Sequence, residues 1–240
     1  MEPLPASRFP LPASRFPLMR VSLREPVNGL THFAGAALSV VGLVVLLVIA
    51  VENGSMRQIV AFSIFGGSLV AMYGASAFYH SLNLTERGVA HMRRIDHMMI
   101  YVLIAGSYTP LCLVLLRGRL GFWLLVAVWI LAVLGVVQTV VWMHAPDWLS
   151  TALYIGMGWL AIIAIKPLLA AAPLGFFWWI LAGGIIYTGG AVIRAAKWPR
   201  AGKLARHFGS HEIWHLCVLG GSFAHYWAIL AYAARGQGGP

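Results

Sequence analysis

Charged residues are scarce in this chain of 240 residues, and acidic ones are the scarcest. Only 10% of positions are charged, and Asp and Glu number 7 against 17 Lys and Arg. A soluble domain carries about 25% charged residues, and so little polar surface cannot enclose a globular particle. The composition therefore excludes an ordinary soluble enzyme. It also excludes a disordered chain, because such chains are poor in apolar residues.

Cysteine is nearly absent as well. Cys112 and Cys217 are the two cysteines, and both stand in apolar stretches, which excludes a disulfide framework. The net charge of +10 would suggest nucleic acid in a soluble protein. In a membrane protein it reflects loop bias and attraction to anionic lipid. We therefore expect membrane lipids as partners and no nucleic acid.

Long apolar runs fill most of the sequence, each about 20 residues or longer and nearly free of charge. They cover about 29–51, 57–82, 95–116, 120–143, 148–170, 174–196 and 210–234. Lipid-embedded backbone must satisfy its own hydrogen bonds, so such runs predict helices, and alternating barrel strands are absent. Residues 25–235 are predicted to form an all-α, seven-helix transmembrane bundle, followed by a short tail at 236–240.

The first 24 residues differ from the rest. The segment Leu4–Pro10 repeats as Leu11–Pro17, and proline at every few positions prevents a helix. No apolar core typical of a signal peptide is present. We expect residues 1–24 to be a disordered or extended arm, with a lipid-surface anchor as the alternative.

Lys and Arg are divided unequally between the two predicted membrane faces, 12 on one and 5 on the other. The richer face includes the arm, a predicted loop with Arg87, Arg93 and Arg94, and a predicted loop beginning at Arg194. The positive-inside rule then places the N-terminus in the cytoplasm and the C-terminus outside. We expect a multi-pass protein of a bacterial-type plasma membrane.

Ionisable residues gather at one predicted end of the helices, where they are costly and point to function. His80 ends the second run, and His211 and His215 begin the seventh. His211 and His215 are four positions apart in the sequence and so share a helix face. Three imidazoles suit a Zn²⁺ ion whose fourth position stays open for water, as in catalytic sites. A lone membrane histidine is more often a packing residue, so the pairing carries this argument.

Two further polar residues lie at the same predicted depth. Ser76 is one turn before His80, and its hydroxyl could bind water or a substrate carbonyl. Asp96 could act as a base on water or orient a ligand. These are the candidate catalytic residues. His32, His91, His144 and His225 have no partner at helical spacing, His97 should face away from Asp96, and His207 is expected in a loop.

The segment His211–His215 also matches the HExxH pattern of zinc proteases, with Glu212 as base. Such membrane proteases take a third ligand from an Asp on a separate helix, and Asp96 is the one acidic residue of the sequence suitably placed for this role. A carboxylate in a first helical turn has a simpler explanation, because the helix dipole favours it there.

The sequence resembles the hemolysin III family, within the progestin and adipoQ receptor group, from about Glu25 to Tyr232. The resemblance rests on several motifs in order: Glu25–His32, Ser76–His80, Arg94–His97, Ala105–Pro110, Tyr154–Trp159, and His211–His215 followed by Gly220–Ser222.

The resemblance implies a seven-helix bundle with a cytoplasmic N-terminus and zinc held by His80, His211 and His215. The Ser and Asp of the family correspond to Ser76 and Asp96. Eukaryotic relatives look like lipid amide hydrolases acting on ceramide. Bacterial members are named for haemolysis and are linked to membrane lipid homeostasis.

The leading hypothesis is a zinc-dependent hydrolase of lipid amide or ester bonds. One alternative is a non-enzymatic sensor or regulator of lipid state, in which zinc is structural. Another is a pore-forming haemolysin, although a pore should carry polar residues along the full length of a helix face. A transporter is a further alternative, but no charged residue lies at an evident midplane.

Overall fold

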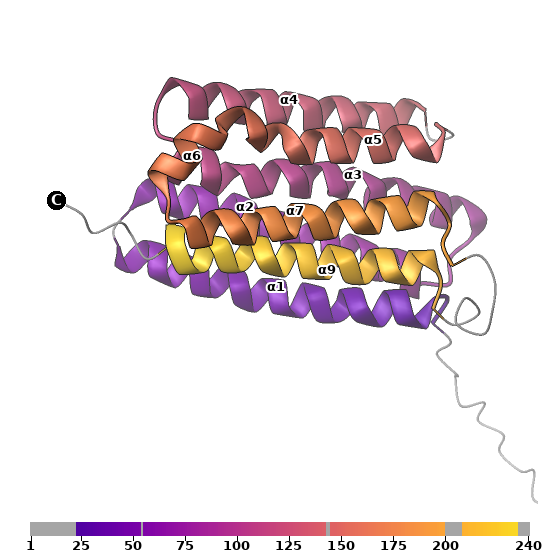
Figure 1. Cartoon of the computed structure of the whole chain (residues 1–240). Helices are drawn as coiled ribbons and strands as arrows, with labels where there is room; N and C mark the ends of the chain where they lie inside the picture. The colour runs from indigo at the N-terminus through magenta and orange to yellow at the C-terminus, as the bar shows by residue number, and fades with distance from the viewer. Residues whose placement is uncertain (1–22, 54, 143–144, 200–207, 235–240) are drawn as a thin grey trace, which may run out of the picture.

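The computed structural model of the chain describes residues 23–53, 55–142, 145–199 and 208–234. In these ranges seven helical units are long and apolar enough to cross a membrane, which confirms the predicted all-α class. They lie side by side along one direction (Figure 1). Their bounds are α1 Pro26–Glu52, α2 Met56–Ser81, α3 Glu86–Pro110 with η1 Leu111–Leu115, α4 Arg119–Val141, α5 Asp147–Gly158 with η2 Trp159–Ala164 and α6 Ile165–Ala171, α7 Leu174–Ala195, and α9 Ser210–Ala228 with η3 Ile229–Ala233.

Nearly all of the predicted arm (residues 1–22) and the whole tail (236–240) fall outside the described residues, as do His144 and His207. The sidedness of the membrane therefore remains a prediction from the Lys and Arg count.

The bundle is apolar outside and partly polar inside. Leu38 and Val141 are 70% and 79% exposed, whereas His80 and Asn28 are 0% and 1% exposed. A surface that is apolar over its whole area is unfavourable in water but favourable against lipid tails. The polar side chains lie inside the bundle, where they can form hydrogen bonds with one another. The chain is an integral, multi-pass membrane protein.

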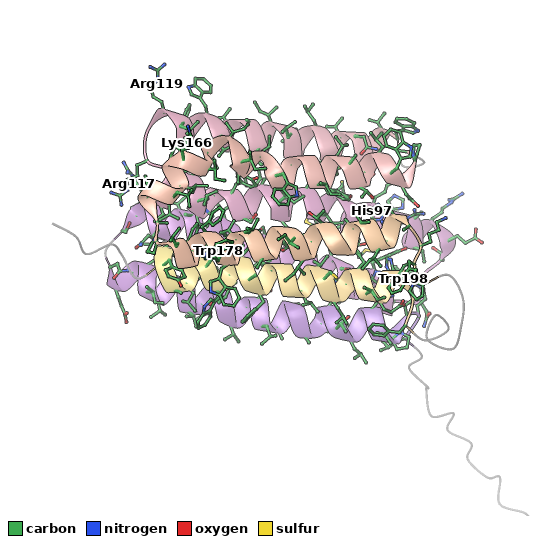
Figure 2. All side chains as sticks on the ribbon, in the orientation of Figure 1. His97, Arg117, Arg119, Lys166, Trp178 and Trp198 are labelled. Atoms are coloured by element: carbon green, nitrogen blue, oxygen red, sulfur yellow. The ribbon has the colours of Figure 1, made fainter. Side chains whose placement is uncertain are left out.

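The two ends of the bundle carry different side chains. Figure 2 shows His97 and Trp198 at one end and Arg117, Arg119 and Lys166 at the other. Trp178 and Trp198 are both about 60% exposed, at 61% and 59%. Exposed tryptophans near both ends are typical of membrane interfaces.

One predicted loop, the one before the third span, is wrong. Helix α3 begins at Glu86, because the Thr85 hydroxyl caps it by accepting from the backbone N–H of Gly88 at 3.3 Å. Arg87, Arg93 and Arg94 therefore lie on a helix. Apolar runs mark where a helix meets lipid, and α3 begins before that region. Helix α7 ends within one residue of the predicted span 174–196, with Arg194 in its last turn.

The fifth span is broken earlier than the predicted position at Lys166–Pro167. The break is the 3₁₀ segment Trp159–Ala164, and Pro167 stands in the first turns of α6, where proline is tolerated. The Tyr108 hydroxyl of α3 donates to the Gly158 carbonyl and accepts from the Ala161 N–H, each at 2.8 Å. A neighbouring side chain thus satisfies backbone groups that the break releases.

In three glycine pairs within the helices, only one glycine of each pair lies in close contact with a neighbouring helix. A Cβ on Gly66 would come within 2.6 Å of Leu43, while one on Gly67 would meet nothing within 4 Å. Gly183 similarly lies against His225, and Gly190 against Cys217 of α9. Close approach of α1 to α2 and of α7 to α9 follows, as expected for small residues in membrane helices.

Candidate metal centre

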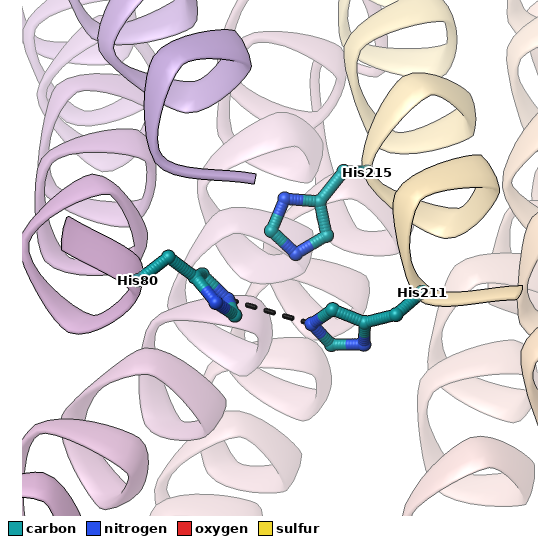
Figure 3. Close-up of side chains that lie close together, drawn as sticks. All are labelled: His80, His211 and His215. Atoms are coloured by element: carbon teal, nitrogen blue, oxygen red, sulfur yellow. Dashed lines mark hydrogen bonds between the residues drawn. The ribbon is translucent and has the colours of Figure 1, made fainter. Parts of the chain in front are cut away.

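Three histidines from two helices meet at one end of the bundle. His80 lies in the last turn of α2, and His211 and His215 lie in the first turns of α9. Their ring nitrogens lie within 4.8 Å of one another, with His80 and His215 buried and His211 half-buried. Figure 3 shows the three rings pointing toward a common centre. The structure therefore brings together the three residues that the sequence selected.

A hydrogen-bond chain holds two of these rings, those of His80 and His211. His80 donates from Nδ1 to Glu25 Oε2 at 2.7 Å, which leaves its Nε2 lone pair facing His211 Nε2 at 3.4 Å. Arg194 donates from Nε to His211 Nδ1 at 3.5 Å. Glu25 stands just before α1 and outside the span. The hydrogen bond with His80 outweighs partial burial and lowers the pKa of Glu25 from its usual 4.5 to about 2.

The three nitrogens fit a tetrahedral metal ion. Bonds of about 2.0–2.1 Å place neighbouring ligand nitrogens roughly 3.3 Å apart, close to the 3.4 Å between Nε2 of His80 and Nε2 of His211. Glu25 holds the far nitrogen of His80, the role that a carboxylate commonly plays behind a metal-binding histidine. Nδ1 of His215 is buried without a hydrogen-bond partner. The cluster could therefore hold a metal ion.

The predicted catalytic pair lies beside this cluster. Ser76 of α2 and Asp96 of α3 are 1% and 8% exposed. Both line a polar cavity of about 40 Å³ together with His211 and His215. One water needs roughly 10–15 Å³ by this measure. The cavity therefore has room for a few water molecules or a small polar group. His97, which the sequence set aside, also lines it.

Sequence reasoning missed the contribution of α1. His32 is buried and stacks on His215, with ring centroids 3.8 Å apart and planes 21° from parallel. Asn28, one turn earlier, donates to both Glu25 at 3.1 Å and Glu212 at 3.2 Å. Glu25, Asn28 and His32 lie at helical spacing on one face, a signal that could have linked them.

Glu212 has a structural explanation. Its Oε2 accepts from the N–H of Gly209 at 2.8 Å, and its Oε1 accepts from Asn28. It therefore caps the start of α9 and ties it to α1. These bonds disfavour the protease alternative, in which Glu212 would act as a base.

An apolar cavity adjoins the polar one. It measures about 80 Å³ and shares five lining residues with its neighbour, namely Met72, Ile100, Tyr154, Trp214 and Val218. Leu103, Ile104 and Ile155 also line it. A polar cavity beside the histidines thus adjoins an apolar one inside the bundle, and the pair suits an amphipathic ligand.

Fold and site together define an integral, seven-helix membrane protein with a buried three-histidine cluster able to hold a metal ion. The family model described as "Haemolysin-III related" matches residues 21–226. The chain belongs to this family.

Similarity to individual proteins supports the same family. The chain is 42% identical to "Hemolysin-3 homolog" of Bacillus subtilis (strain 168) over 211 residues, 88% of this chain and 95% of that protein. It is 39% identical to "Hemolysin-3" of Bacillus cereus over 209 residues, 87% and 91% of the two chains. A weaker similarity, 27% over 194 residues, links it to "Progestin and adipoQ receptor-like protein 1" of Caenorhabditis elegans, covering 72% of this chain and 43% of that one. The wider progestin and adipoQ receptor group is thereby supported.

Proposed function

We propose that this protein is a zinc-dependent hydrolase that cleaves an amide or ester bond of a membrane lipid. The main supporting observation is that two histidines of the cluster, His211 and His215, line a polar cavity that Ser76 and Asp96 also line. A structural metal site has no need of a cavity with a carboxyl group and a hydroxyl group in its wall.

His80, His211 and His215 would hold zinc, which supplies Lewis acidity that polarises a carbonyl and lowers the pKa of water. Asp96 accepts a proton from the attacking water on a carboxyl oxygen. It then returns this proton to the nitrogen or oxygen that leaves. Ser76 donates a hydrogen bond to the substrate carbonyl oxygen and positions the carbonyl carbon. Glu25 holds the His80 ring in the tautomer whose Nε2 is free.

The adjoining apolar cavity supports a lipid substrate. An acyl chain would lie along Leu103, Ile104 and Ile155 while its carbonyl reaches the histidine end. Such a chain gains nothing by leaving the bilayer, so the substrate enters between helices. We place the enzyme in a bacterial-type plasma membrane, where it would act in lipid homeostasis, with the site at the cytoplasmic leaflet.

The test is hydrolysis of fatty amides and esters by purified, detergent-solubilised protein, with zinc present and with zinc chelated. Turnover should need zinc, and it should be lost in His211→Ala. The Arg117→Gln variant, at the other end of the bundle, is a matched control that should retain turnover. Equal rates in the wild-type and His211→Ala proteins would overturn the proposal.

A second candidate is a structural metal that joins α2 to α9 in a protein that senses lipid state. It is favoured by the way the two helices are linked, through His80 and His211 at one level and a hydrogen bond of 2.7 Å from Tyr73 to Ser222 further along. In that case Asp96→Asn should leave cellular function intact, while His80→Ala should unfold the bundle.

A further inference from the structure

Arg194 lines the polar cavity and has no ion-pair partner among the described residues. It lies in the last turn of α7, is half-buried, and lines the cavity that His211 and Asp96 also line. Its Nε contacts His211 Nδ1 at 3.5 Å, which is the outer limit of a hydrogen bond. Among the described residues no carboxylate forms an ion pair with it.

The contact with His211 belongs to one tautomer. Arg194 can donate to Nδ1 only while that nitrogen carries no proton, and the proton of the neutral ring is then on Nε2. A metal ion on Nε2 requires the opposite arrangement, with the proton on Nδ1, and two N–H groups cannot bond to each other. Metal binding therefore removes this partner from Arg194 and leaves the guanidinium facing the cavity.

A half-buried guanidinium that lacks a partner favours an anion. Arginine is always charged, and its planar fork matches a carboxylate with two parallel hydrogen bonds. Arg93 of α3 lines the same cavity and adds a second positive charge. Asp96 and Asp147 are the acidic residues in the lining, so the two arginines offset them and the metal ion makes the chamber positive.

The positions of the two cavities indicate which part of the substrate carries the negative charge. The apolar cavity suits the acyl chain, so the polar cavity beside Arg194 receives the group released on hydrolysis. At about 40 Å³ the chamber suits a small group and not a large headgroup.

We propose that Arg194 binds the carboxylate of an N-acylated small amino acid, so that the substrate class is N-acyl amino acids. The inference rests on the proposed hydrolase function. Water adds to the amide carbonyl, the C–N bond breaks, the nitrogen takes the proton held by Asp96, and the products are a fatty acid and a free amino acid. Arg194 is a specificity residue and contacts no reacting atom.

The test compares two probes that differ in charge, N-palmitoylglycine and the neutral N-palmitoylethanolamine. We expect the zinc-loaded protein to hydrolyse the glycine amide with a kcat/KM at least about 10-fold higher, since hydrogen bonds to charged groups are strong. This ratio should fall toward 1 in Arg194→Gln and lie between in Arg194→Lys, which keeps the charge but loses the fork. Arg117 is an exposed arginine at the opposite end (Figure 2), and Arg117→Gln should leave the ratio unchanged.

A binding measurement separates this inference from the proposed function. Zinc-loaded Asp96→Asn protein is titrated with each probe, and binding is followed by thermal stabilisation. Tighter binding of N-palmitoylglycine that Arg194→Gln abolishes supports the carboxylate site even if neither probe is ever hydrolysed. Hydrolysis of both probes at equal rates, with equal binding, overturns the inference and leaves the hydrolase standing.

Discussion

The two ends of the bundle both contain polar side chains that hydrogen-bond across helices, but these side chains have different partners. At the end opposite the histidines, Asn53 donates to the Ala234 carbonyl at 2.7 Å and Gln58 donates to the Ala233 carbonyl at 3.0 Å. At the histidine end, side chains bond to side chains, as His80 does with Glu25 at 2.7 Å.

This difference separates structural from functional polarity. The last carbonyls of a helix have no partner within it, so Asn53 and Gln58 complete the backbone hydrogen bonds where the last helix ends. No backbone need explains the convergence of His80, His211 and His215. Among the described residues, both ring nitrogens of His32 and Nδ1 of His215 are buried without hydrogen bonds at the histidine end, while Gln58 Oε1 is such an atom at the other end. Such groups are costly, and their greater number at the histidine end favours a functional role there.

The largest effect should follow removal of a metal ligand. His211→Ala leaves two imidazoles, which cannot hold an ion tightly, so metal content should fall from about one ion per chain to roughly a tenth or less. Elemental analysis of purified protein measures this. Gln58→Ala, the matched change at the other end, should retain its metal, and loss of metal in both variants would erase the contrast between the two ends.

A loss of rate without loss of metal should follow Asp96→Asn. The amide keeps the size of the carboxyl group but cannot accept the proton, so hydrolysis should fall by about 10²- to 10⁴-fold. Metal content and thermal stability, measured on the same sample, should stay near those of the wild type. Full activity in this variant would favour the structural role of the metal.

A smaller effect should follow Glu25→Gln. The hydrogen bond to His80 would lose its charge, and metal affinity should weaken by about 10- to 100-fold. Competition with a chelator of known affinity measures the change. Glu52→Gln, an exposed carboxylate where α1 ends, is the control and should bind metal as the wild type does. Equal affinities in the two variants would exclude a supporting role for Glu25.

The smallest effect should come from the structural end. Gln58→Ala removes a buried hydrogen bond to the Ala233 carbonyl and should cost on the order of 1 kcal/mol of unfolding free energy. Thermal unfolding in detergent measures it. Hydrolytic activity per folded molecule should not change, and a selective loss of activity would show that the two ends are coupled.

The sequence predicted the seven spans because uninterrupted apolar runs report contact with lipid. It placed the start of α3 about nine residues too late. The first turns of α3, which carry Arg87, Arg93 and Arg94, extend beyond the apolar region. Helix boundaries outside lipid depend on caps such as Thr85, which hydropathy does not register.

The site was only partly predictable for a similar reason. His211 and His215 are paired by helical spacing, and His80 was found by its inferred depth. Glu25 and His32 act through contacts with helices distant in sequence, and no spacing rule links them to His80 or His215. Arg194 falls inside the predicted span 174–196, but only the packed structure shows that its side chain lines the cavity beside His211.

X-ray absorption at the zinc edge of the purified protein tests the central claim most directly. The account predicts about one zinc ion per chain with three nitrogen ligands at roughly 2.0–2.1 Å and one further oxygen ligand, the pattern of an open catalytic site. In His211→Ala this spectrum should be lost. A closed shell of four protein ligands, or no zinc in protein that folds and binds lipid normally, would contradict it.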